Sequence, residues 1–311
     1  MNTARASAAK GEALRPVMQF AAQCLLACAA LLAPAASAAP AVVADIAPVH
    51  SLVAAVMEGA GEPDLLADQG ASVHHMQLRP SQARRIAEAD LVVTIGPALA
   101  PWIGRPLGGL REGASALVLL DVPGTVLRNY DGDGTDPHAW LDPGNAVLWV
   151  GAIADALAAI DPGNSTLYAA NAVRARDAIA EAERQAAALL TAAGGRSFAT
   201  WHDSLGYFAA RFGLAMAPAV SAGDAAAPGA RHLAEMRRRA EAGEIACLFP
   251  EPHEGQALVA RLAEGTDTRI GGALDPEGET LTPGPALYPA LILELAGTIA
   301  ACLTEGGTSG G

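Results

Sequence analysis

Lysine, aromatic side chains and positive charge are all scarce in this sequence of 311 residues. Lysine occurs once, as Lys10, so beyond the N-terminal segment no lysine can form a Schiff base or serve a phosphate-binding loop. Aromatic residues make up 4% of the chain, and the formal net charge is −13 with no basic stripe, which excludes nucleic acid as a partner. The 51% apolar content, spread along the chain, excludes a disordered protein.

The first 38 residues have the pattern of a secretory signal peptide. Three basic residues precede an apolar run from 17 to 33, and an Ala-Ser-Ala tripeptide ending at Ala38 supplies a small-residue cleavage site. The run is short for a membrane span, which needs about 20 apolar residues. The tetrapeptide ending at Cys28 also fits a lipoprotein signal, and lipid anchoring at Cys28 stays open as the alternative. We therefore expect cleavage after Ala38 and export of residues 39–311.

Only two cysteines, Cys247 and Cys302, lie beyond the signal peptide, and both have apolar neighbours. In an oxidising compartment two such cysteines most simply form one disulfide bond. Two buried free thiols are the alternative.

Short apolar runs alternate with helical patterns after Pro40, which predicts an α/β fold with parallel sheets covered by helices. The expected strands are 42–46, 65–66, 91–95, 116–122, 198–200 and 245–249, and the expected helices are 50–58, 82–89, 145–160, 231–242 and 254–263. We expect Ser81 to cap the helix over 82–89.

A segment without proline or glycine runs from Ser165 to Ala193 and is rich in Ala, Arg and Glu. As a single helix it would be about 40 Å long. We expect two (β/α) lobes, residues 39–160 and 196–311, joined by a rigid backbone helix within 161–195. Such an arrangement places a binding cleft at the carboxyl ends of the strands, between the lobes.

Three histidines stand in loops that follow expected strands: His74, His138 and His202, each 64 residues from the next. This spacing is too long for a zinc finger and suits ligands brought from separate loops into one cleft. Asp275, in the last quarter of the chain, could add a carboxylate, and three imidazoles with one carboxylate suit Zn²⁺. The spacing alone also fits unrelated surface histidines.

Six short motifs, in the same order, resemble those of the metal-binding solute-binding proteins of ABC importers, and among these the ZnuA-type zinc-binding branch. The resemblance extends from about residue 42 to 304. The motifs are Ala47-Pro48-Val49-His50-Ser51-Leu52-Val53, Gly70-Ala71-Ser72-Val73-His74 with Leu78-Arg79-Pro80-Ser81, Ala89-Asp90-Leu91-Val92-Val93 with Gly96-Pro97, Asp136-Pro137-His138-Ala139-Trp140-Leu141-Asp142-Pro143, His202-Asp203 with Gly206-Tyr207-Phe208, and Cys247-Leu248-Phe249-Pro250-Glu251-Pro252 with Leu274-Asp275-Pro276.

The resemblance implies a periplasmic protein that is not an enzyme, and that captures Zn²⁺ and delivers it to an ABC-transporter permease with a cytoplasmic ATPase. It implies ligation by His74, His138 and His202, with Asp275 or water as the fourth ligand, and in relatives a disulfide joins the positions of Cys247 and Cys302. A zinc metallochaperone is a further expected partner, and we expect a monomer. Zinc-type relatives often carry a loop rich in histidine and acidic residues before the Pro-His-Ala-Trp motif, which is Pro137-His138-Ala139-Trp140 here. Residues 129–135, which precede it in this chain, contain acids and no histidine.

Four residues are candidates to support the ligands without binding the ion: His50, His75, Asp203 and Glu251. A secreted zinc hydrolase could use the same three histidines with an open water position. The sequence contains no H-E-x-x-H or G-x-S-x-G motif, which argues against that alternative. A metal-independent adhesin on the same fold is the remaining alternative.

Overall fold

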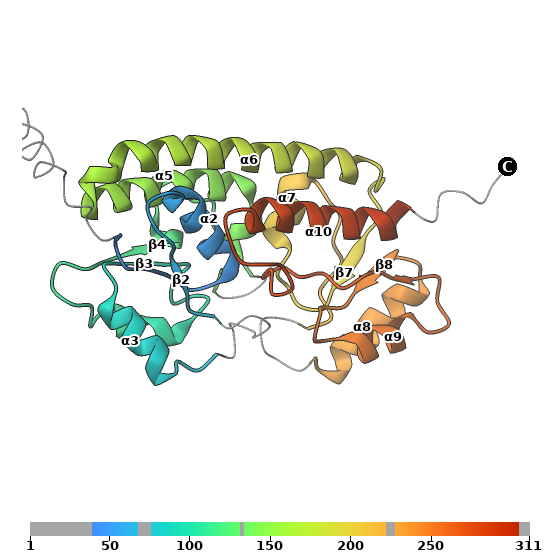
Figure 1. Cartoon of the computed structure of the whole chain (residues 1–311). Coiled ribbons are helices and arrows are strands. Elements are labelled where there is room, and N and C mark those ends of the chain that lie inside the picture. The colour runs from blue at the N-terminus through green and yellow to red at the C-terminus, as the bar shows by residue number, and fades with distance from the viewer. Residues whose placement is uncertain (1–38, 68–75, 131–133, 222–227, 305–311) are drawn as a thin grey trace, which may run out of the picture. The chain divides into compact units, whose positions relative to one another are not determined.

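The computed structural model describes residues 39–67, 76–130, 134–221 and 228–304, and every structural statement below concerns these ranges. The first half of the described chain contains a four-stranded parallel sheet in the order β2-β1-β3-β4 (Figure 1). The strands are β1 (Val42–Ala44), β2 (Asp64–Leu65), β3 (Leu91–Thr94) and β4 (Ser115–Val118). Strands β1 and β3 are buried along their whole length, which explains their continuous apolar sequences. The signal-peptide prediction lies outside the described residues.

Helices α2 (Ala47–Met57), α3 (Pro80–Glu88) and α4 (Gly104–Leu107) follow strands of this sheet. The predicted cap of α3 at Ser81 is wrong, because the helix begins one residue earlier, at Pro80. Proline at the first helical position has its φ angle already set for a helix and gives up a backbone N–H that no helical partner would satisfy. The side chain of Gln82 completes this end by accepting a hydrogen bond from the Arg79 backbone N–H at 2.8 Å.

A second parallel sheet lies in the other half of the described chain, in the order β7-β8-β9. Its strands are β7 (Phe198–Thr200), β8 (Cys247–Phe249) and β9 (Arg269–Ile270), and its helices are α7 (Gly206–Phe212), α8 (Ala230–Glu241) and α9 (Gln256–Ala263). The predicted α/β fold with two parallel sheets is confirmed. Strand β9 ends at Ile270, and residues 271–274, which lead to Asp275, are irregular.

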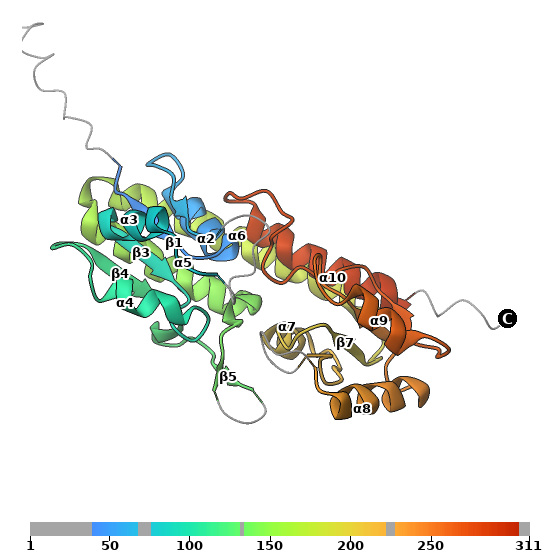
Figure 2. The same ribbon diagram turned by 90° about the horizontal axis from the view of Figure 1, so that it is seen from below.

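The long helix predicted from residue 165 is confirmed as α6 (Ser165–Thr191), which has 27 residues and therefore a length of about 40 Å. Four of its eight buried residues are alanine, a small side chain that lets neighbouring helices approach. Helices α2, α5 (Pro143–Ile160) and α10 (Leu287–Thr304) pack along it (Figures 1 and 2). Asn171 fixes one of these contacts by donating to the carbonyls of Val56 and Glu58 at the end of α2.

Helices α5 and α10 are long and apolar enough to cross a membrane by length and composition. Both instead place a large share of their side chains against α6 and the sheets, and burial in a protein core accounts for their composition. The main core combines side chains of β1, β3, α2 and α5 with side chains of β7, β8 and α10. A smaller core lies between β8, α8 and α9.

The predicted disulfide is present in the structure and joins Cys247 of β8 to Cys302 of α10. It closes a sequence separation of 55 residues. It therefore ties the centre of the second sheet to the last helix, which packs along α6. The domain boundaries at residues 160 and 196 stay predictions, since the main core draws on both sides of α6.

Candidate metal centre

His138 lies directly after a short antiparallel hairpin formed by β5 (Arg128–Asn129) and β6 (Thr135–Asp136). Its side chain is fully buried. One carboxylate oxygen of Asp136 accepts from the His138 backbone N–H at 3.0 Å and lies 2.9 Å from His138 Nδ1. A carboxylate at this distance places the imidazole proton on Nδ1, so the lone pair of Nε2 is left to bind a ligand.

His202 follows β7 and is held in the same way. The carboxylate of Glu251, which follows β8, accepts from His202 Nδ1. Burial raises the pKa of Glu251, and the neighbouring His202 acts in the opposite direction. Because β7 and β8 are adjacent parallel strands, the loops that follow them meet at one edge of the sheet, and this brings Glu251 to His202.

The two imidazoles face each other with their Nε2 atoms 3.3 Å apart. Two ligands of a tetrahedral zinc ion, with Zn–N bonds of about 2.0–2.1 Å, lie about 3.3–3.4 Å apart. The carboxylates beside both Nδ1 atoms favour the tautomers that turn the Nε2 lone pairs toward one another, and a cation between them would offset their repulsion. The pair thus has the separation of two ligands of a Zn²⁺ ion.

The hairpin is joined to the segment that follows His202 through Tyr207 of α7. The Tyr207 hydroxyl accepts from the Arg128 backbone N–H at 2.8 Å and donates to the Asp136 carbonyl at 2.9 Å. Burial raises the pKa of Tyr207 to about 12, so the hydroxyl keeps its proton. On the other side, the Tyr130 hydroxyl lies 3.3 Å from His138 Nδ1.

Asp275 has a different environment from the two histidines. Its carboxylate accepts hydrogen bonds from the Glu279 and Thr280 backbone N–H groups and from the Thr280 hydroxyl. The segment is tied to the His138 turn, because Trp140 Nε1 donates to the Pro276 carbonyl at 2.8 Å. Burial, and next the neighbouring carboxylates of Glu277 and Asp275, raise the pKa of Glu279 to about 8. Metal ligation by Asp275 stays a prediction.

The other candidates fall in different places. His74 and His75 lie outside the described residues. His50, on α2, is 3.0 Å through Nε2 from the Pro63 carbonyl, and burial lowers its pKa. Within the described ranges, no three His, Cys, Asp or Glu side chains are grouped closely enough to hold a metal ion among themselves. His138 and His202 are therefore the part of the candidate site that the structure describes.

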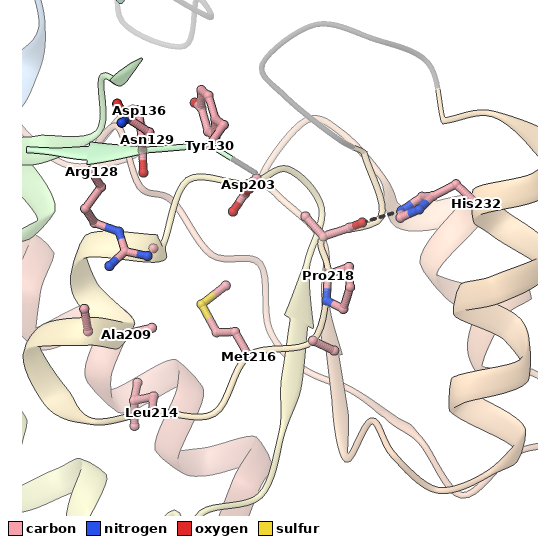
Figure 3. Close-up of a pocket in the computed structure, with 14 residues that line it drawn as sticks. Arg128, Asn129, Tyr130, Asp136, Asp203, Ala209, Leu214, Met216, Pro218 and His232 are labelled. Atoms are coloured by element: carbon pink, nitrogen blue, oxygen red, sulfur yellow. Dashed lines mark hydrogen bonds between the residues drawn. The ribbon is translucent and has the colours of Figure 1, made fainter. Parts of the chain in front are cut away.

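A cavity of about 710 Å³ lies beside this pair, between the hairpin, α7 and α8 (Figure 3). Asp203 lines it, as do Arg128 and Asp136 on one side and His232 on the other. His232 Nε2 lies 2.7 Å from the Ala219 carbonyl. Asp136, which holds His138, forms part of the wall of this cavity.

Asp136, Tyr130 and Tyr207 contact the ligand segments, and the sequence reasoning gave none of them a role. For Asp136 a signal was available, since an aspartate two residues before a histidine can reach both its backbone N–H and its ring. Tyr207 lies in the quoted Gly206-Tyr207-Phe208 motif, but nothing in the sequence indicated that its hydroxyl bonds to a carbonyl 71 residues away in the chain.

Two parallel sheets, one long helix and a histidine pair supported by carboxylates define a metal-binding α/β protein. Comparisons with known proteins narrow this class. Residues 42–302 match the family model described as "Zinc-uptake complex component A periplasmic". The chain therefore belongs to this zinc-uptake component A family.

Relatives and solved structures agree with this assignment. The chain is 40% identical over 298 residues to the high-affinity zinc uptake system protein ZnuA of Paracoccus denitrificans, covering 84% of this chain and 91% of that protein. It is 30% identical to the protein of the same name from Brucella suis, covering 85% and 92%. Its fold is similar to that of the periplasmic zinc-binding protein TroA of Treponema pallidum, with a TM-score of 0.74 at 21% identity over 86% of this chain and 99% of TroA.

Proposed function

We propose that this protein captures Zn²⁺ outside the cytoplasmic membrane and delivers it to the permease of an ABC transporter, whose cytoplasmic ATPase drives uptake. Family membership and the names of the relatives support zinc as the cargo. The observation that carries the proposal is the His138–His202 pair, with its Nε2 atoms 3.3 Å apart and each Nδ1 on a carboxylate. We infer that His74 is the third ligand and that Asp275 or water is the fourth.

The chemistry of this site favours a carrier over an enzyme. The secreted hydrolase weighed from the sequence has no support from the family or the relatives. Neutral imidazoles suit Zn²⁺ better than Mn²⁺, for which oxygen ligands are preferred. A closed set of four ligands would hold the ion without leaving a position for catalytic water.

Location and partners follow from the same proposal. A protein of this kind works in the periplasm after cleavage of residues 1–38, with lipid anchoring at Cys28 as the alternative. Its partners are a membrane permease with its ATPase and, as a further proposal, a zinc metallochaperone that loads the site. We propose that it acts as a monomer.

The test is a metal titration of residues 39–311 after removal of bound metal by a chelator. Native mass spectrometry with Zn²⁺ and Mn²⁺ should show one tightly bound zinc per chain that Mn²⁺ does not replace. The variants His74→Ala, His138→Ala and His202→Ala should each lose it.

His232→Ala is the matched control, because His232 contacts the Ala219 carbonyl and not the pair, and it should keep full binding. Stoichiometric zinc in a protein lacking all three ligand histidines, or no zinc in the wild type, would refute the proposal.

A further inference from the structure

The hydroxyl of Tyr207 occupies an unusual place, at the open end of a two-stranded hairpin. Arg128 and Asp136 are directly paired across β5 and β6. Tyr207 accepts from the N–H of one and donates to the carbonyl of the other, so its single hydroxyl bridges the two strands. The guanidinium of Arg128 lies over the Tyr207 ring, 5.8 Å from its centroid, and covers it.

Each of these contacts leads to one side of the metal centre. Asp136 is held at its carbonyl by Tyr207, and its carboxylate holds His138 at two points. Tyr207 is the second residue of α7 and lies five residues after His202 along the chain. The segments that carry His138 and His202 are therefore joined twice. Their imidazoles approach at the Nε2 atoms, and the Tyr207 hydroxyl bonds to the hairpin that precedes His138.

Gly206 shows how closely these segments approach. A Cβ atom at this position would lie 3.2 Å from Arg128 Nε and 3.3 Å from an Asp136 carboxylate oxygen. Such contacts are tighter than most van der Waals contacts, so a side chain here would shift the Arg128 guanidinium or the Asp136 carboxylate by a few tenths of an ångström. Glycine at residue 206 therefore leaves the Asp136 carboxylate in the place where it holds His138.

We propose that Tyr207 is a positioning residue for the metal centre, whose hydroxyl sets the separation of His138 and His202 and thereby favours Zn²⁺ over larger divalent ions. This proposal rests on the proposed zinc-binding function and adds to it a residue that does not touch the ion. A fixed separation of 3.3 Å matches the Zn–N distances, whereas a pair free to open would also accept ions with longer bonds to nitrogen.

The direct test is Tyr207→Phe, which keeps the ring and its contact with Arg128 but removes both hydrogen bonds. Removal of a group that orients a ligand typically weakens metal binding by about 10–100-fold, and for this more distant group we expect about tenfold for Zn²⁺. Binding of the larger Cd²⁺ should change much less, so the zinc dissociation constant divided by the cadmium dissociation constant should rise. If the hydroxyl had a purely structural role, Tyr207→Phe would weaken the binding of Zn²⁺ and Cd²⁺ by the same factor.

Tyr168→Phe is the matched control. Tyr168 is a buried tyrosine on α6 whose hydroxyl donates to Asp161 at 2.7 Å, away from the metal centre. It should keep the wild-type dissociation constants for both metals. Equal behaviour of Tyr207→Phe and Tyr168→Phe in both titrations would overturn the proposal.

Gly206→Ala gives a second, independent test that survives any folding defect of Tyr207→Phe. Alanine is a better helix former than glycine, so α7 itself should not be weakened. The added methyl should displace the Arg128 guanidinium or the Asp136 carboxylate, lower the zinc affinity and reduce the preference for zinc over Cd²⁺.

Unchanged zinc and cadmium binding in Gly206→Ala would count against a role for this junction. If the wild type binds no stoichiometric zinc, the proposed function fails first. If the wild type binds zinc and neither variant alters the zinc-to-cadmium ratio, only the positioning role of Tyr207 fails.

Discussion

The carboxylate of Glu251 offers a sharp perturbation of the metal centre, because it contacts a proposed ligand and not the ion. Glu251→Gln removes the negative charge beside His202 Nδ1, while the amide oxygen can still accept the hydrogen bond. Loss of a group that orients a metal ligand typically costs about 10–100-fold in affinity. We expect about tenfold for Gln, or about 1.4 kcal/mol, and up to about 100-fold for Glu251→Ala, which removes the hydrogen bond as well.

Glu251→Gln should not lower the free energy of unfolding of the metal-free protein, although it lowers the zinc affinity. Burial raises the pKa of Glu251, which means that its charged form is held in the folded protein at a net cost. Glutamine carries no charge, so the free energy of unfolding of the metal-free variant should stay equal or rise. A loss of zinc affinity without a loss of stability separates an effect on the ligand from general damage to the fold.

Glu254→Gln is the matched control for this substitution. It removes the same charge from the same loop, but Glu254 accepts a hydrogen bond from Trp201 Nε1 at 2.8 Å and not from a proposed ligand. Competition titrations against a chromophoric chelator give the zinc dissociation constants, and urea titrations give the stabilities. Equal zinc affinity of the two variants would refute the reasoning that Glu251 acts through His202.

Three further predictions concern pH and stability. Zinc retention measured by equilibrium dialysis should fall as the pH drops below about 6.5, where free imidazole takes up a proton that competes with the metal. Burial raises the pKa of Asp45 to about 6 despite hydrogen bonds from Thr94, Ile95 and Ile46. A carboxyl whose pKa is higher in the folded than in the unfolded chain stabilises the fold at low pH and loses that contribution as the pH rises through about 6. The loss occurs between the ordinary aspartate pKa of 3.8 and the raised value of about 6, and it amounts to about 3 kcal/mol in total. Urea titrations at pH values between these two limits should show that Asp45→Asn lacks this loss. Replacing both disulfide cysteines by serine should lower the free energy of unfolding by about 4 kcal/mol, because the bond closes a separation of 55 residues.

Much of the fold could be predicted from the sequence because its signals are local. The buried parallel strands are short apolar runs, and α6 is a long segment without helix breakers. Helix α10 was missed because its sequence is apolar on every face, so it lacks the periodicity that marks a helix at a protein surface. The start of α3 was misplaced because proline at the first helical position outweighed a serine as the signal.

In the metal centre, too, the residues marked by local sequence signals were predicted, and those that depend on tertiary contacts were not all predicted. His138 and His202 stand out in the sequence because each lies in a loop after an expected strand and within a motif that resembles those of the family, and the structure brings their Nε2 atoms together. Their supporting groups depend on tertiary contacts. Glu251 reaches His202 because β7 and β8 are neighbours, and Tyr207 of α7 bonds to Arg128 and Asp136, which lie more than 70 residues earlier in the chain. Neither relation can be read from a single sequence.

The shared core limits how this protein could respond to a metal ion. Side chains of α10, such as Leu291 and Ile292, pack in one cluster with side chains of β1, α2 and α5. Moving the two sheets apart would expose such residues, at about 1.5–3 kcal/mol for each large apolar side chain. Uptake and release of an ion should therefore depend on the loops after the strands and on contacts such as Tyr207–Asp136 and Glu251–His202. In such a design, zinc selectivity is set by small, fixed distances between a few side chains, which is why loss of one distant hydroxyl should be measurable in the metal preference.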